Sequence, residues 1–238
     1  MPSEATLLAI AIVAVASAVQ ASIGFGLALV AAPLLVLLDR AYVPGPLIAT
    51  GLALGVAMAW RERSAIDTAG VRAATLGRVI GVIPAGYALH VVSQAAFDVL
   101  FASLVLAAVG LSLLHPRVTP TPRAVLGASV VSGFMGTITS IGGPPIALVY
   151  QRSSGPALRA TLALIFVIGS LISLVALASI GRFGPAELRA SAPLLVGVAL
   201  GVSISQPLLP LFDRGATRPL VLGLSAVSAL AVLARALG

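Results

Sequence analysis

The sequence contains no cysteine and no lysine, and charged side chains of any kind are rare in it. The absence of cysteine excludes disulfides, thiolate metal sites and thiol catalysis. Only 9% of the 238 residues are charged and 59% are hydrophobic, whereas an ordinary soluble domain is about 25% charged. A soluble fold of this length cannot hide so much apolar surface, because even larger domains leave about a quarter of their unfolded area in water. The composition therefore indicates an integral membrane protein.

The fourteen basic side chains are all arginines and give a net charge of +7. Most of them lie in the short gaps between apolar runs, where arginines orient a membrane protein. Binding to nucleic acid would need a basic stripe, which the sequence lacks, so no nucleic-acid partner is expected. A secretory signal is also not expected, because Glu4 is the only charged side chain before the first apolar run and a signal carries positive charge there.

The apolar runs predict an all-α, polytopic membrane bundle with about eight hydrophobic segments. A spanning helix needs roughly 20 apolar residues, so six segments fit single spans. The first and fifth are too long, since at 1.5 Å per residue they would extend about 48 Å and about 42 Å as continuous helices. Each of these two must therefore break. In chain order the segments are Leu7–Leu38, Val43–Trp60, Ala73–Leu89, Val99–Leu114, Ala124–Gln151, Ala160–Gly181, Ala190–Phe212 and Pro219–Ala234.

Both long segments carry glycine or proline where a break is needed, at Ser22–Gly26 and at Ser140–Pro145. Glycine lowers helix propensity and proline lacks a backbone donor. The two motifs share Ser-Ile-Gly and lie 118 residues apart. A small-residue packing motif, glycine at positions four apart, also recurs after 120 residues in the third segment of each half. Its members are Gly77 and Gly81 in the first half and Gly197 and Gly201 in the second.

These recurrences predict two homologous halves in one membrane domain. We expect an N-terminal repeat over 1–115, a cytoplasmic linker over 116–123 that is rich in proline and polar residues, and a C-terminal repeat over 124–238. The loop with Arg61, Arg63 and Arg72 is the most basic and is predicted to be cytoplasmic. If the broken segments are re-entrant hairpins, the halves are inverted copies; if each crosses once, the halves are parallel copies. The additional cytoplasmic arginines are then Arg152, Arg159, Arg214 and Arg218 in the inverted version, or Arg182, Arg189 and Arg235 in the parallel one.

The two breaks are the candidate binding site. Non-helical chain inside the hydrocarbon region is stable only where it is buried in protein or lines a polar cavity. Matching interrupted segments in two halves of a chain indicate a transporter site near the bilayer midplane. A helix that restarts after a break presents free N–H groups and a positive dipole end, which attract anions. The alternative is that the glycines only pack helices and that Ser and Thr bond back to their own helix. The candidate binding residues are Gln20, Ser22, Gly24, Phe25, Gly26, Arg78, Thr139, Ser140, Gly142, Gly143 and Pro144.

Arg78 lies inside the third segment, and an ionisable residue within the membrane is a functional candidate. The alternative is that it snorkels, because it lies about a turn and a half from the cytoplasmic end of that segment. Asp98 and His90 are expected at segment boundaries. Without an acidic residue near mid-membrane or a histidine cluster, neither a proton relay, a metal site nor a catalytic constellation is expected. No phosphate-binding glycine loop occurs either, so we expect no enzyme and no cofactor.

The two broken segments resemble the paired signature segments of the TauE/SafE family of sulfite and organosulfonate exporters. The matching stretches are Ala18–Leu35 and Ser132–Tyr150, and the length and the internal duplication match as well. The first motif here contains Phe25 and Leu27, whereas many members carry three glycines in a row. The resemblance implies a bacterial or archaeal inner-membrane permease for sulfite, organosulfonates or related carboxylates. By the same resemblance the translocation site includes Gly24, Gly26, Pro33, Gly142, Gly143, Pro144 and Pro145.

The leading hypothesis is a multi-pass secondary transporter of the inner (plasma) membrane. Its partners are a small anionic solute and the lipid bilayer, and the sequence leaves a homo-oligomer open. A second hypothesis is a non-transporting structural or assembly protein whose glycines only pack helices. An intramembrane enzyme would need a nucleophile and a base within reach of each other, which the sequence does not offer.

Overall fold

The computed structural model describes residues 3–61, 63–114, 118–151, 155–212 and 217–237. Residues 116 and 117 of the expected linker, the preceding residue 115, Arg152 and Arg214 lie outside the described residues. The described part of the chain is all-helical. Its elements are α1 (Glu4–Ile23), α2 (Leu27–Leu38), η1 (Arg40–Tyr42), α3 (Gly45–Arg61), η2 (Arg63–Ala65), α4 (Thr68–Val91), α5 (Gln94–Leu113), α6 (Pro122–Thr139), α7 (Gly143–Tyr150), α8 (Gly155–Ser179), α9 (Pro185–Phe212) and α10 (Thr217–Leu237).

Six helices in the described part of the chain are long and apolar enough to cross a membrane, and they belong to α1, α4, α5, α8, α9 and α10. Large apolar side chains cover their outer faces; Ile83, Tyr87 and Val175, for example, are about 70% exposed. A surface of this kind is stable against hydrocarbon and not against water. The architecture therefore agrees with a polytopic membrane bundle.

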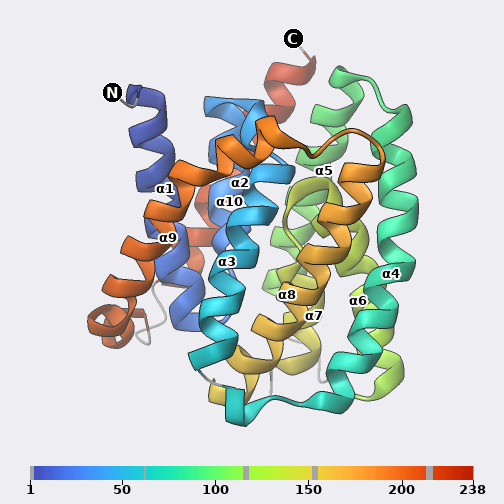
Figure 1. Ribbon diagram of the computed structural model, residues 1–238, viewed down its shortest axis with the longest axis vertical. Helices are drawn as coiled ribbons and strands as arrows, with labels where there is room; N and C mark the ends of the chain where they lie inside the picture. The colour runs from blue at the N-terminus through green and yellow to red at the C-terminus, as the bar shows by residue number, and fades with distance from the viewer. Residues whose placement is uncertain (1–2, 62, 115–117, 152–154, 213–216, 238) are drawn as a thin grey trace.

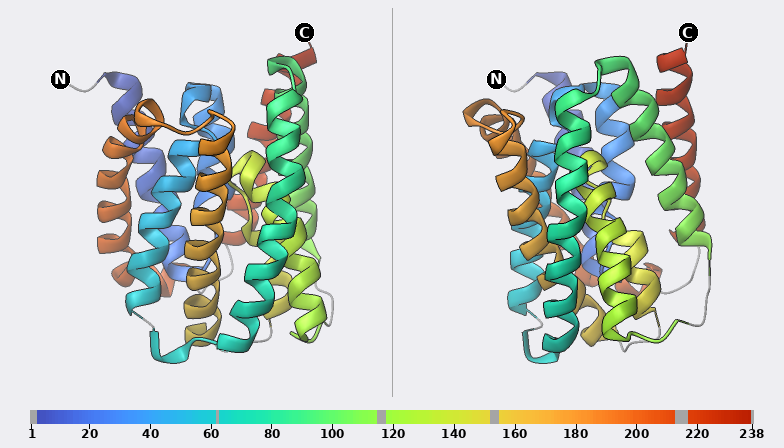
Figure 2. Two further views of the ribbon diagram at one scale, coloured as in Figure 1. Left: turned by 45° about the vertical axis from the view of Figure 1, so that its right-hand side comes forward. Right: turned by 90° about the vertical axis from the view of Figure 1, so that its right-hand side faces the viewer.

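The first and fifth hydrophobic segments each fold into two helices that run in opposite directions. α1 ends at Ile23 and α2 begins at Leu27, while α6 ends at Thr139 and α7 begins at Gly143. In Figures 1 and 2, α1 descends from the N-terminus and α2 returns to the same end of the bundle, whereas α6 and α7 form a hairpin from the opposite end. We call these the first hairpin (α1–α2) and the second hairpin (α6–α7).

The turns of the two hairpins depend on residues in left-handed conformations. Gly24 has φ +97° and Gly26 has φ +129°, values that side-chain-bearing residues rarely adopt. Gly24 also ends α1 by donating its N–H to the carbonyl of Gln20 at 2.8 Å. In the second hairpin Ser140, with φ 66°, takes the same role at the end of α6.

The hairpin turns are bonded to opposite ends of α3. Arg61, the last residue of α3, donates from Nη2 to the carbonyl of Ala21 at 3.2 Å. Ser140 Oγ donates to the carbonyl of Pro44, directly before α3, at 3.1 Å. The first hairpin therefore extends toward the C-terminal end of α3 and the second toward its N-terminal end. The two turns meet between these ends, where a Cβ on Gly143 would lie 3.2 Å from the Cβ of Phe25.

The glycine motifs pack helices of one half onto helices of the other. α4 packs against α6 at Gly77 and Gly81, and α9 packs against α1 at Gly197 and Gly201. A Cβ on any of the four would lie 2.0–2.6 Å from a carbonyl oxygen of the partner helix. Only glycine permits this approach. α3 pairs with α8 and α5 with α10 in the same cross-half manner.

Candidate functional site

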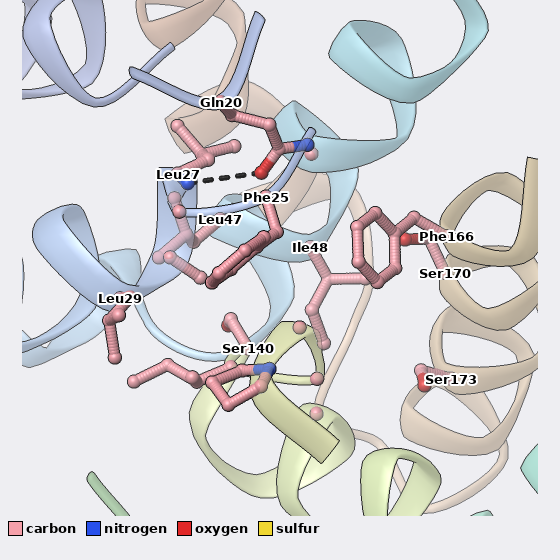
Figure 3. Close-up of a pocket in the computed structure, with 18 of the residues that line it drawn as sticks. Gln20, Phe25, Leu27, Leu29, Leu47, Ile48, Ser140, Phe166, Ser170 and Ser173 are labelled. Carbon is pink, nitrogen blue, oxygen red and sulfur yellow. Dashed lines mark hydrogen bonds between the residues drawn. The ribbon is translucent and has the colours of Figure 1, made fainter. Parts of the chain in front are cut away.

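A cavity of about 60 Å³ lies between the two hairpin turns. Figure 3 shows that its labelled residues come from both breaks, from the start of α3 and from α8. The wall combines small polar groups with aromatic and aliphatic side chains. The lining residues are Gln20, Phe25, Gly26, Leu27, Ala28, Leu29, Leu47, Ile48, Gly51, Arg78, Gly136, Ser140, Ile141, Gly142, Gly143, Pro144, Phe166, Ser170 and Ser173.

Most of the candidate binding residues meet at this cavity, and three do not line it. Gln20, Phe25, Gly26, Arg78, Ser140, Gly142, Gly143 and Pro144 form part of its wall. Ser22 Oγ instead donates to the carbonyl of Ala18, and Thr139 Oγ1 to that of Met135, both at 2.8 Å. Bonding back to the same helix is the alternative that the sequence left open for such hydroxyls. Gly24 faces away from the cavity, toward Arg159.

The first break offers the cavity fewer amide donors than the sequence suggested. The N–H of Leu27, the first residue of α2, is donated to Gln20 Oε1 at 3.0 Å (Figure 3). The next two residues of α2, Ala28 and Leu29, also line the cavity. Their N–H groups belong to the first turn of a helix and have no acceptor within it. Gln20 thus satisfies the first N–H of α2, and the N–H groups of Ala28 and Leu29 remain as donors at the cavity wall.

The second break is also poor in amide donors. Two of the first three residues of α7, Pro144 and Pro145, have no N–H. Helix α7 begins at Gly143, so Gly143 is its first residue with an N–H donor. The carbonyl of Gly142 accepts a hydrogen bond from Ser132 Oγ of α6. This bond fixes the backbone of the break against α6.

Arg78 is the charged group of the cavity. It is 4% exposed, and Nη1 donates to the carbonyl of Ser132 at 3.1 Å, while Nε has no partner. Within the described residues no carboxylate lies in ion-pair range of it. Helix α4 begins at Thr68, five residues before the hydrophobic segment, so Arg78 lies in the third turn. The snorkelling alternative is therefore wrong: the guanidinium points into the protein.

Three glycines enclose the guanidinium of Arg78. A Cβ on Gly169 of α8 would lie 2.4 Å from Nε, and one on Gly136 of α6 would lie 2.9 Å from Nη1. At Gly142 the corresponding distance to Nη1 is 3.0 Å. The ring of Phe166 lies 6.0 Å from Cζ, at the outer limit of a cation–π contact. We call Gly136, Gly142 and Gly169 the glycine socket.

Helix α8 contributes residues that sequence reasoning missed. Phe166, Ser170 and Ser173 line the cavity, and Ser173 Oγ lies 2.8 Å from Thr137 Oγ1. These positions are three or four residues apart, a spacing that puts side chains on one face of a helix. That spacing was the available signal. It was hidden because the rest of α8 is mostly apolar.

Asp98 is not a boundary residue, as the sequence suggested, but a buried one. It is 2% exposed, and Oδ2 pairs with Arg40 of η1, while Oδ1 has no partner. Asp98 does not line the cavity. His90, near the end of α4, is exposed as expected. The Arg40–Asp98 pair thus joins the end of the first hairpin to α5 outside the candidate site.

Comparison with known proteins adds one match. The family model described as Sulfite exporter TauE/SafE matches residues 8–232, nearly the whole chain. No curated protein and no solved structure matches the chain. The match covers the second hairpin, all but the first four residues of the first hairpin, and every residue of the cavity wall.

Proposed function

The chain belongs to the TauE/SafE family of sulfite-exporter-type membrane permeases, and we propose that it is a secondary transporter that binds one small anion between its two hairpin turns. The anion is sulfite, an organosulfonate or a related carboxylate. The observation that carries the proposal is Arg78, a buried cation without a carboxylate partner in the described residues, at the wall of a cavity. A buried charge without a counter-charge is costly. The transported anion supplies the counter-charge.

The other groups of the wall have distinct roles in this proposal. Ser140 and the first-turn amides of Ala28 and Leu29 donate hydrogen bonds to the oxygens of the anion. Phe25 and Phe166 exclude water from it. Gly26, Gly142, Gly143 and Pro144 keep the backbone close to the anion, while Ser22, Gly24 and Thr139 shape the breaks without touching the ligand.

We propose further that 1–115 and 124–238 are inverted repeats joined by the linker 116–123. The two hairpins enter from opposite ends of the bundle (Figure 2). The glycine motif of α4 lies over the carbonyls of Leu126 and Val130, and that of α9 lies over those of Ile10 and Ala14. The four-residue spacing is the same in both contacts. Inverted repeats support alternating access, because each half can adopt the conformation of the other.

The arginine distribution supports an orientation in the inner membrane. One end of the bundle holds the N-terminal ends of α4, α6, α8 and α10 (Figures 1 and 2). The elements at this end include Arg63, Arg72, Arg123 and Arg159. An excess of loop arginines marks the cytoplasmic side. The hairpin of α1 and α2 therefore begins and ends on the opposite, external side.

Transport by purified protein in liposomes tests the proposal. We expect labelled sulfite to cross, and Arg78→Gln to lower the transport efficiency about 10- to 100-fold, as for loss of a hydrogen-bonded charge. Arg72→Gln is the matched control, since Arg72 lies on the same helix and is exposed. The site assignment fails if folded Arg78→Gln protein transports as well as the Arg72→Gln protein. The transporter proposal itself fails if the unaltered chain moves none of sulfite, sulfoacetate or acetate.

A further inference from the structure

The charges that surround the cavity indicate the charge of the anion that it binds. We infer that the cavity accepts its anion in the singly charged form and disfavours doubly charged anions. This inference rests on the proposed function and specifies the substrate of the same site. It follows from three features: the number of charges in the wall, the cancellation of helix dipoles at the breaks, and the small volume.

Arg78 is the only charged side chain among the described residues that line the cavity. In the described part of the chain, the elements packed against Arg78 place no second titratable side chain in the cavity wall. α6 presents the carbonyl of Ser132 and the backbone of Gly136, and α8 presents Gly169 and the ring of Phe166. The residues one turn away on α4, such as Ala74 and Val82, are also uncharged. The side chains therefore supply a charge of +1 and no proton acceptor.

Helix dipoles add little to that charge. A helix N-terminus carries a partial charge of roughly +0.5 and a C-terminus roughly −0.5. Each break contains one of each, since α1 ends where α2 begins and α6 ends where α7 begins. At the first break a single residue accepts from both sides: the backbone carbonyl of Gln20 accepts from Gly24, and its side chain accepts from Leu27. The net positive charge facing the ligand is thus close to that of one guanidinium.

A single guanidinium neutralises a monoanion and leaves one negative charge of a dianion uncompensated. Uncompensated charge is expensive away from water. The volume of about 60 Å³ holds about four to six waters when the cavity is empty, so a bound anion displaces most of the water that could hydrate the second charge of a dianion. The glycine socket holds the guanidinium against α6 and α8, so the cation cannot follow the ligand to a wetter position. The wall therefore discriminates by charge as well as by size.

Competition between two probes of the same shape tests the inference. Methanesulfonate and sulfate are both tetrahedral, and they differ by the replacement of one oxygen by a methyl group and by one unit of charge. We expect methanesulfonate to inhibit labelled sulfite transport in proteoliposomes at a concentration at least about tenfold lower than sulfate, as a difference of one buried unpaired charge requires. Sulfate that inhibits as well as methanesulfonate, or better, overturns the inference.

The pH dependence of sulfite transport gives a second measurement, because the second ionisation of sulfite lies near neutral pH. The half-saturating concentration of total sulfite should rise with pH above that ionisation, by at least about tenfold in all, because the singly charged form binds at least about tenfold more tightly than the doubly charged form. The inhibition constant of methanesulfonate, whose charge is fixed, should stay constant over the same range. A half-saturating sulfite concentration that is constant or falls with rising pH overturns the inference while the transporter proposal stands. Absence of any sulfite flux would instead refute the proposed function.

Discussion

Gly81 of α4 lies so close to Val130 of α6 that a Cβ on Gly81 would be 2.0 Å from the Val130 carbonyl oxygen. The obstacle is backbone within a helix, which cannot move aside as the end of a flexible side chain can. Arg78 lies one turn before Gly81 on α4. The close approach of Gly81 to Val130 therefore brings α4 near enough to α6 for the Arg78 guanidinium to donate to the carbonyl of Ser132.

Gly81→Ala is expected to lower the free energy of unfolding by about 3 kcal/mol, the upper part of the range for overpacking in a close-packed interior. The two helices must separate to admit the methyl group. Gly127→Ala on α6 is the control, because a Cβ there meets nothing within 4 Å. Alanine favours helix, so this control should be neutral or slightly stabilising. Thermal unfolding in detergent measures the melting temperatures of both variants. Equal melting temperatures for Gly81→Ala and Gly127→Ala would contradict the packing argument.

The Arg40–Asp98 pair predicts unequal effects of removing either charge. Arg40→Gln leaves the buried Asp98 carboxylate without a cation and should cost about 2 kcal/mol, reduced from the value for fully buried pairs because the Arg40 side chain is 37% exposed. Asp98→Asn should cost less, because the remaining arginine can turn toward water. Chemical denaturation measures both variants. A larger loss for Asp98→Asn than for Arg40→Gln would show that the buried charge is not the dominant cost.

The locations of the breaks could be predicted from sequence because their cause is local. α1 ends at Ile23, inside the motif Ser22–Gly26, and the two glycines of that motif have positive φ. α6 ends at Thr139, directly before Ser140–Pro145. Local backbone preference was enough to locate both chain interruptions. It did not reveal that Gln20 occupies the first amide of α2, since that bond spans seven residues through a side chain.

The burial of Arg78 could not be predicted, because it depends on contacts between the halves. The hydrophobic segment begins at Ala73, but α4 begins five residues earlier at Thr68, where Asp67 caps it by accepting the Gly70 N–H at 3.1 Å. The longer helix moves Arg78 from the end of a span into its interior. Its neighbours Gly136 and Gly169 lie on α6 and α8, far along the chain, and no periodicity in α4 identifies them.

Tyr150 and Asp67 should be energetically coupled. Tyr150, which is 2% exposed, donates from its hydroxyl to Asp67 Oδ2 at 3.1 Å and so links the end of α7 to the start of α4. Tyr150→Phe should cost about 1 kcal/mol for one hydrogen bond. Asp67→Ala should cost about 2 kcal/mol, because the α4 cap is lost as well. Unfolding measurements on the double variant should give a loss about 1 kcal/mol smaller than the sum of the two single losses, and strictly additive losses would contradict the coupling.

The absence of cysteine makes the contact between the hairpin turns directly testable. A Cβ on Gly143 would lie 3.2 Å from the Cβ of Phe25, close to the separation of about 3.5–4.5 Å that a disulfide requires. The double variant Phe25→Cys, Gly143→Cys should therefore cross-link under mild oxidation. After proteolysis in the linker, gel mobility shows whether the two fragments are joined.

Alternating access requires the two turns to move relative to each other. Sulfite itself cleaves disulfides, so the assay uses labelled methanesulfonate; we expect oxidation to stop its transport by the double variant and reduction to restore it. The single variants, treated in the same way, should not respond to oxidation. Full transport by the cross-linked protein would mean that the turns stay together throughout the cycle, and failure to cross-link would mean that they do not meet.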